Sequence, residues 1–167
     1  MLVILADTTS AAWGELAHLK ELVAFSLSLM EFPSELDFIG ALTHLQDLSI
    51  SGTGTLSDCS FLNTLTELTS IILPDTPIQN WVDRIANPAK VEYLCCRATD
   101  RDDLAPLGNM PKLRYLQVFG SEAVDLTPLA DYDLEVWLAD GMEAHGVDRL
   151  GPGVRLNGPG SKVPTRG

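Results

Sequence analysis

Basic residues are scarce in this sequence. It has 11 Lys and Arg against 23 Asp and Glu, a formal net charge of −12 and a pI of about 4.4. Phosphate backbones and anionic membranes attract positive surfaces, so the composition argues against nucleic acid or a membrane as partner. The hydrophobic share of 46% against 20% charged residues is typical of a globular chain. At 167 residues it is long enough to bury the core of one domain.

Cysteines are few, and long apolar runs are missing. Cys59, Cys95 and Cys96 are odd in number and include an adjacent pair, which is a poor disulfide framework. We therefore predict free thiols in a reducing, cytoplasmic compartment. The first basic residue is Lys20, so the N-terminus does not read as a signal peptide. No run approaches the roughly 18 apolar residues that a membrane helix needs.

The usual motifs of catalysis and metal binding are also missing. No H-x-x-H or C-x-x-C pair occurs, which argues against zinc. The acidic run 100–103 does not begin a calcium-binding loop. The sixth position of such a loop requires Gly and the twelfth an acidic residue, but here they are Ala105 and Pro111. The segment 52–54, GTG, lacks the Lys of a phosphate-binding loop. With no clustered nucleophile and base either, we predict a protein that is not an enzyme and has no cofactor or metal.

What the sequence does contain is a repeat. The stretch 42-LTHLQDLSISGT-53 starts with leucines three apart and continues with Leu48 and Ile50 two apart. The first spacing suits a helical turn and the second a strand. The pattern recurs with spacings of 23, 23, 23, 22 and 21 residues at Phe25, Leu48, Ile71, Leu94, Leu116 and Trp137. A period of this length indicates a solenoid.

The second half of each unit repeats as well. Five segments carry two apolar residues three apart, mostly after an acidic residue, at 35–39, 58–62, 81–85, 103–107 and 125–129. This spacing predicts a short helix or a 3₁₀ turn.

The pattern resembles leucine-rich repeats of the bacterial type with 21–23 residues. The family signature is L-x-x-L-x-L-x-x-N/C-x-L, and residues 68–78 follow it with Leu68, Ile71, Leu73, Thr76 and Ile78. The resemblance covers roughly residues 15–145. It implies an α/β fold: a right-handed leucine-rich repeat solenoid with a parallel β-sheet on its concave face. Short helical, 3₁₀ or extended segments are expected on the convex face.

The two ends extend this array. Counting 23 residues back from Phe25 reaches Leu2, so the first strand lies at the N-terminus and the chain starts in mid-repeat. An uncapped coil exposes core, so we expect it to contact a preceding domain or a partner subunit; the alternative is a strand that caps itself by burying little. Residues 154–156 are a candidate last strand. We therefore expect a leucine-rich repeat domain of about six to seven coils over 1–157 and a flexible Gly/Pro tail over 158–167.

A narrower resemblance rests on two segments. Residues 103–107 (DLAPL) and 111–116 (PKLRYL) resemble arrays in actinobacterial proteins, some of which lie C-terminal to NTPases of the NACHT/STAND type. This implies a ligand-sensing part of a larger immune-type protein, with a role in antiphage defence. The chain itself has no NTPase motif. The alternative is a free-standing adaptor or an inhibitor of the immunity-protein type that caps a basic target protein.

Strand alternation predicts which side chains cover the concave face. The first rows are small and polar, whereas the later rows are large, with Tyr93 and Tyr115 as neighbours. Exposed Tyr, Phe and Arg are favoured at protein contact sites, although such residues also simply shield a sheet. We therefore predict a non-catalytic module that binds a protein ligand through the concave face, with Cys95 as a surface thiol. The candidate contact residues are Ile72, Tyr93, Cys95, Arg97, Tyr115, Gln117, Phe119, Leu138 and Asp140.

Overall fold

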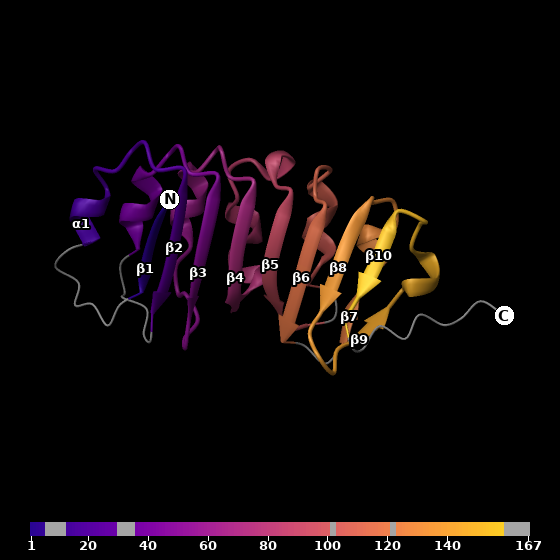
Figure 1. The fold of residues 1–167 in the computed structure, drawn as a ribbon. Coiled ribbons are helices and arrows are strands. Elements are labelled where there is room, and N and C mark those ends of the chain that lie inside the picture. The colour runs from indigo at the N-terminus through magenta and orange to yellow at the C-terminus, as the bar shows by residue number, and fades with distance from the viewer. Residues whose placement is uncertain (6–12, 30–35, 101–102, 121–122, 159–167) are drawn as a thin grey trace.

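The chain folds into a solenoid built around one parallel β-sheet (Figure 1). The structure, a computed structural model, describes residues 1–5, 13–29, 36–100, 103–120 and 123–158. Eight strands lie side by side in sequence order, interrupted only by two strands that pair elsewhere. In order they are β1 (Leu2–Leu5), β2 (Ala24–Leu29), β3 (Asp47–Gly52), β4 (Ser70–Pro77), β5 (Tyr93–Ala98), β6 (Tyr115–Gly120), β8 (Leu134–Leu138) and β10 (Val154–Asn157).

The register of the first six strands confirms the predicted repeat. Leu2 lies opposite Phe25, and the inward positions then follow through Leu48, Ile71, Leu94 and Leu116. Backbone hydrogen bonds also join successive coils just before each strand, for example from Gln46 N–H to the Val23 carbonyl at 2.8 Å and from Thr69 N–H to the Gln46 carbonyl at 2.9 Å. The N-terminal strand therefore belongs to the sheet, and so does the predicted strand at 154–156.

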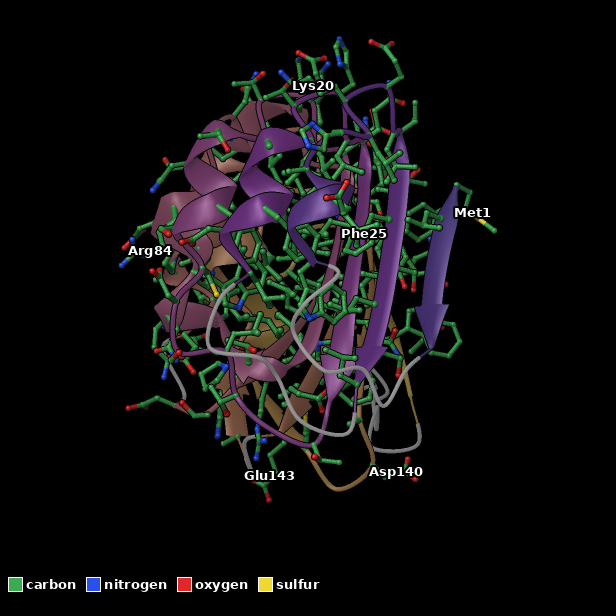
Figure 2. The ribbon with its side chains drawn as sticks, turned by 90° about the vertical axis from the view of Figure 1, so that its left-hand side faces the viewer. Met1, Lys20, Phe25, Arg84, Asp140 and Glu143 are labelled. Atoms are coloured by element: carbon green, nitrogen blue, oxygen red, sulfur yellow. The ribbon has the colours of Figure 1, made fainter. Side chains whose placement is uncertain are left out.

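The convex side consists mainly of 3₁₀ turns, as Figure 2 shows from the side, with Arg84 on the layer of turns and Phe25 between the two layers. Each of the five segments predicted from the apolar spacing overlaps such a turn. Asp58 accepts a hydrogen bond from Ser60 N–H at 2.8 Å, which explains an acidic residue before the turn. The helices are α1 (Trp13–Leu16), η2 (Asp37–Ala41), η3 (Ser60–Thr64), η4 (Ile78–Asn80), η5 (Val82–Arg84), η6 (Pro88–Lys90), η7 (Ala105–Asn109), η8 (Thr127–Leu129) and η9 (Val147–Arg149).

A second, two-stranded parallel sheet joins β7 (Ala123–Asp125) to β9 (Glu143–His145). Gly146 follows β9 with a φ of 71°, in the left-handed region. A Cβ at this position would collide with Thr127 Oγ1 and Asp125 Oδ1. The return to the last coil therefore requires glycine here.

The core runs continuously between the sheet and the turns. Its side chains are the leucines, isoleucines and valines of the repeat, and each coil buries its apolar face only against its neighbours. Trp81 is the largest fully buried side chain, and its Nε1–H donates to the Thr76 carbonyl at 3.2 Å. In the N-terminal coils Trp13 stacks on Phe38 with 5.5 Å between ring centroids.

The predicted register of β8 is wrong by one residue. Leu116 lies opposite Val136 and Gln117 opposite Trp137, so the sixth coil has 20 residues instead of 21. Leu156 follows Val136 after 20 residues again, so the last coil matches the one before it. Leu138, predicted on the concave face, is 4% exposed and belongs to the core. A slip of one residue exchanges the two faces of a strand, and here it places Trp137 outside.

The end of β4 departs from the regular ladder. Leu73 of β4 pairs with Cys96 of β5. The next residue of β5, Arg97, pairs with Pro77, so residues 74–76 of β4 have no partner on β5 and bulge out. Pro74 has no N–H to donate to a ladder, which explains why the regular pairing stops there.

Candidate interaction surface on the concave face

The aromatic residues of the concave face gather on β5, β6 and β8. In the strand register, Tyr93, Tyr115 and Glu135 are direct neighbours in one row, and Cys95, Gln117 and Trp137 form the next. The rings of Tyr93 and Tyr115 are 6.2 Å apart between centroids and tilted by 32°. We call Tyr93, Tyr115, Gln117 and Trp137 the aromatic patch.

Two members of the patch are unusually exposed for their type. Tyr115 is 50% and Trp137 48% exposed. The other exposed large hydrophobic residues in the described part of the chain are Met1, Leu19 and Val23, which lie near the N-terminus. The exposed aromatic surface of the described residues is therefore concentrated on adjacent strands of one face.

The side chain of Trp137 is held in place. Its Nε1–H donates to Glu135 Oε1 at 3.0 Å, and Asn157 Nδ2 donates to the same oxygen at 3.0 Å. Glu135 thus holds the ring at its polar edge, and Asn157 on the neighbouring strand holds the Glu135 carboxylate. A side chain that is ordered before a partner arrives loses less entropy on binding.

A shallow hollow of about 190 Å³ lies within the patch. It is lined by Tyr93, Tyr115, Leu116, Gln117 and Trp137. Sequence reasoning included three of these residues but missed Trp137. The signal was present: Leu134, Val136 and Leu138 alternate with Glu135 and Trp137 in strict period two.

Cys95 is not the surface thiol that the sequence predicted. It occupies a concave-face position, opposite Ile72 and Gln117, yet it is only 4% exposed. It also lies outside the core cluster, so larger neighbours on the face itself cover it. Burial, with the nearby charge of Asp75, raises its pKa to about 11, which makes the thiol unreactive at neutral pH. Cys59 and Cys96 are buried free thiols as well.

The other predicted contact residues surround the patch less closely. Ile72 is half-buried on β4, and Arg97 is exposed opposite the half-buried Phe119 at the far ends of β5 and β6. Asp140 is exposed but lies beyond the end of β8 at Leu138. The predicted set therefore divides into a central patch and a periphery.

The N-terminal half of the same face is small and polar. Ser26, Ser28, Ser49 and Ser51 occupy its rows on β2 and β3, with Ser51 Oγ donating to Ser28 Oγ at 3.3 Å. This contrast limits the aromatic surface to the C-terminal half of the array.

The described residues hold no group of three or more His, Cys, Asp or Glu side chains placed to bind a metal ion. In the acidic run, the Asp103 carboxylate serves a turn instead, accepting from the N–H groups of Thr99 at 2.5 Å and Asp100 at 2.8 Å. Among the helices that the structure describes, none has the length and apolar character to span a membrane.

The fold is that of a leucine-rich repeat solenoid, and comparison with solved structures supports this. Internalin C2 of Listeria monocytogenes has a TM-score of 0.60 and 19% identity, over 85% of this chain and 74% of its own. A leucine-rich repeat protein of Leptospira interrogans has a TM-score of 0.58 and 16% identity, over 86% of this chain and 38% of its own. The Listeria monocytogenes internalin inlF has a TM-score of 0.50 and 14% identity, over 87% of this chain and 49% of its own.

These likenesses establish the architecture. The chain spans less than half the length of the Leptospira protein and of inlF. No protein family and no curated protein matches the sequence.

Proposed function

We propose that this chain is a non-catalytic protein-interaction module that binds its partner through the concave face. The observation that carries the proposal is the aromatic patch, in which Tyr115 and Trp137 are each about half exposed on neighbouring strands. Tyr and Trp are the residues that most often dominate binding energy at protein interfaces. An extended parallel sheet offers a partner a long contact surface of the kind that solenoids use.

The patch accounts for binding without catalysis. Its polar groups are phenols, an amide and an indole, and the nearest thiol, Cys95, is buried and has a raised pKa. We include the whole predicted contact set in the proposal except Leu138, which the core buries, and we add Trp137. Free thiols at all three cysteines agree with a reducing compartment, so we place the module in the cytoplasm.

The test is capture of a partner from a lysate of the source cells. A double variant, Tyr115→Ser with Trp137→Ser, should lose the captured protein while keeping its far-ultraviolet circular dichroism and cooperative melting. The matched control is Leu19→Ser with Val23→Ser, which removes two hydrophobic side chains of similar exposure, 43% and 44%, outside the patch. Capture that survives the first pair and fails with the second would move the site to the N-terminal end.

Two biological settings suit such a module. The segments 103–107 and 111–116 support the ligand-sensing part of a larger immune-type NTPase, acting in antiphage defence. The net charge of −12 supports the alternative, a free-standing adaptor or inhibitor that caps a basic target. The reading frame upstream of the codon for Met1 separates them: NTPase motifs in frame indicate the sensor, and an in-frame stop codon indicates the adaptor.

A further inference from the structure

We propose that the hollow in the aromatic patch receives the guanidinium group of an arginine from a basic segment of the partner. This rests on the proposed binding through the concave face and assigns the chemistry of its central contact. The occupant follows from the size of the hollow, its aromatic lining, its hydrogen-bonding groups and the charge of the chain.

The size suits one side chain. Typical pockets for small molecules and cofactors measure roughly 300–1,000 Å³, whereas this hollow measures about 190 Å³. It is also open on a sheet face, where the rest of a peptide has room to continue. A single long side chain fits these dimensions better than a separate ligand does.

The lining suits a flat cation. Three aromatic residues, Tyr93, Tyr115 and Trp137, line the hollow, and the two tyrosine rings lie 6.2 Å apart between centroids with a tilt of 32°. Aromatic faces attract cations, Trp most strongly, and the guanidinium of arginine also stacks on them as a plane. An apolar side chain gains the contact area but not this electrostatic attraction.

Hydrogen-bond acceptors lie in and beside the hollow: the phenol oxygens of Tyr93 and Tyr115 and the amide oxygen of Gln117 line it, and the Glu135 carboxylate is the register neighbour of Tyr115. The indole N–H of Trp137 already donates to Glu135 Oε1, as does the Asn157 amide, so this donor is occupied. Glu135 Oε2, the amide oxygen of Gln117 and the two phenol oxygens have no hydrogen-bond partner among the residues that the structure describes. A guanidinium carries five N–H donors and no acceptor, which complements this set.

The charges on the face favour a cation at this place. Glu135 is a direct neighbour of Tyr115 in the strand register, and the chain as a whole carries 12 more negative than positive charges. Two cations share the face: Arg97 at the far end of β5, and Arg155 beside Glu135 on β10. Arg155 forms no ion pair with Glu135 within 4.0 Å, since the ion pairs between described residues are Lys90–Glu67 and Arg114–Asp133. The Glu135 carboxylate is thus available to an incoming cation.

The experiment is a titration of the isotope-labelled chain with N-acetyl-arginine amide, followed by NMR. Trp13 and Trp81 are buried, so the indole N–H of Trp137 reports the exposed tryptophan. We expect a saturable shift of this signal in the millimolar range, a weaker one with the lysine amide, and none with the leucine or glutamate amides. Trp137 is identified from the missing signal of the Trp137→Leu variant.

Two variants test the roles of the residues. Glu135→Gln should weaken arginine amide binding about two- to fivefold, as expected for a partly exposed charge pair. The charge-matched control Glu143→Gln, at an exposed site on β9, should leave the affinity unchanged. Trp137→Leu keeps an apolar side chain but removes the aromatic face, and it should weaken binding about three- to tenfold, read from the backbone amide of Gln117.

Several results would overturn the assignment. They are the absence of a saturable shift with the arginine amide, equal binding of the leucine or lysine amide, or unchanged affinity in Glu135→Gln. Such a result leaves the proposed function standing if the Tyr115→Ser, Trp137→Ser chain still fails to capture the partner. If that double variant captures the partner normally, the concave-face proposal fails by itself.

Discussion

Cys95 gives a direct chemical test of the concave face. Its thiol lies among the strand positions that we assign to partner binding, but the neighbouring side chains leave it only 4% exposed. Burial, assisted by the charge of Asp75, raises its pKa from the ordinary 9.0 to about 11. Because only the thiolate reacts with iodoacetamide, the folded chain should protect Cys95 chemically as well as sterically.

The magnitude follows from the two pKa values. At pH 8 a thiol with a pKa of 9.0 is about one-tenth ionised, and one with a pKa of about 11 is about one-thousandth ionised. Alkylation of Cys95 in the folded chain should therefore be at least about 100-fold slower than in the same chain in urea. Fragmentation of the digested peptide in the mass spectrometer assigns the modification to Cys95 or to the adjacent Cys96. A folded rate within tenfold of the unfolded rate would place Cys95 at the surface and refute the packing described for the face.

Three further predictions concern packing and stability in urea unfolding. Gly146→Ala should lower the free energy of unfolding by about 1–3 kcal/mol, because a Cβ there is strained and meets its neighbours. Its control, Gly14→Ala in a helix with open space around the new Cβ, should be neutral or slightly stabilising. Leu138→Ala should cost about 2–5 kcal/mol and more than Trp137→Ala; the opposite order would favour the 21-residue register for the sixth coil. Stability should also fall from pH 9 to pH 11, because burial raises the pKa of Cys59 and Cys95 to about 11 and raises that of Cys96 as well, so the unfolded chain releases these protons first; the slope is at most about 1.4 kcal/mol per pH unit for each thiol. A flat profile over that range would show that these thiols ionise alike in both states.

The fold could be predicted from the sequence because the same pattern of apolar residues occurs in several copies. In each coil the spacing of apolar residues changes from three to two where the strand begins. A misassigned residue in one copy is therefore recognised by comparison with the others. The pairing of Leu2 with Phe25 shows that simple counting placed even the first strand. The 3₁₀ turns could be predicted for the same reason, because their apolar spacing also repeats.

The site was harder to predict because it depends on a single copy. In the sixth coil, Trp137 has the size and hydrophobicity of a core residue, and a spacing of 21 placed it inward. The buried positions are instead Val136 and Leu138, and the shorter coil became visible only when β8 was paired with β6. Cys95 illustrates a second limit. Alternation gives the face on which a side chain lies, but not how deeply its neighbours bury it.

The coils shorten from 23 to 22 and then to 20 residues while the inward positions of the strands stay aligned. The missing residues must therefore come from the return segments behind the sheet. Insertions and deletions in those segments leave the strand that follows in its place, so this chain can change length without rearranging its concave face. Gain or loss of a whole coil has a different effect, since it widens or narrows that surface by one strand. The two faces of the solenoid are thus free to evolve separately, one by changes of length and the other by substitutions.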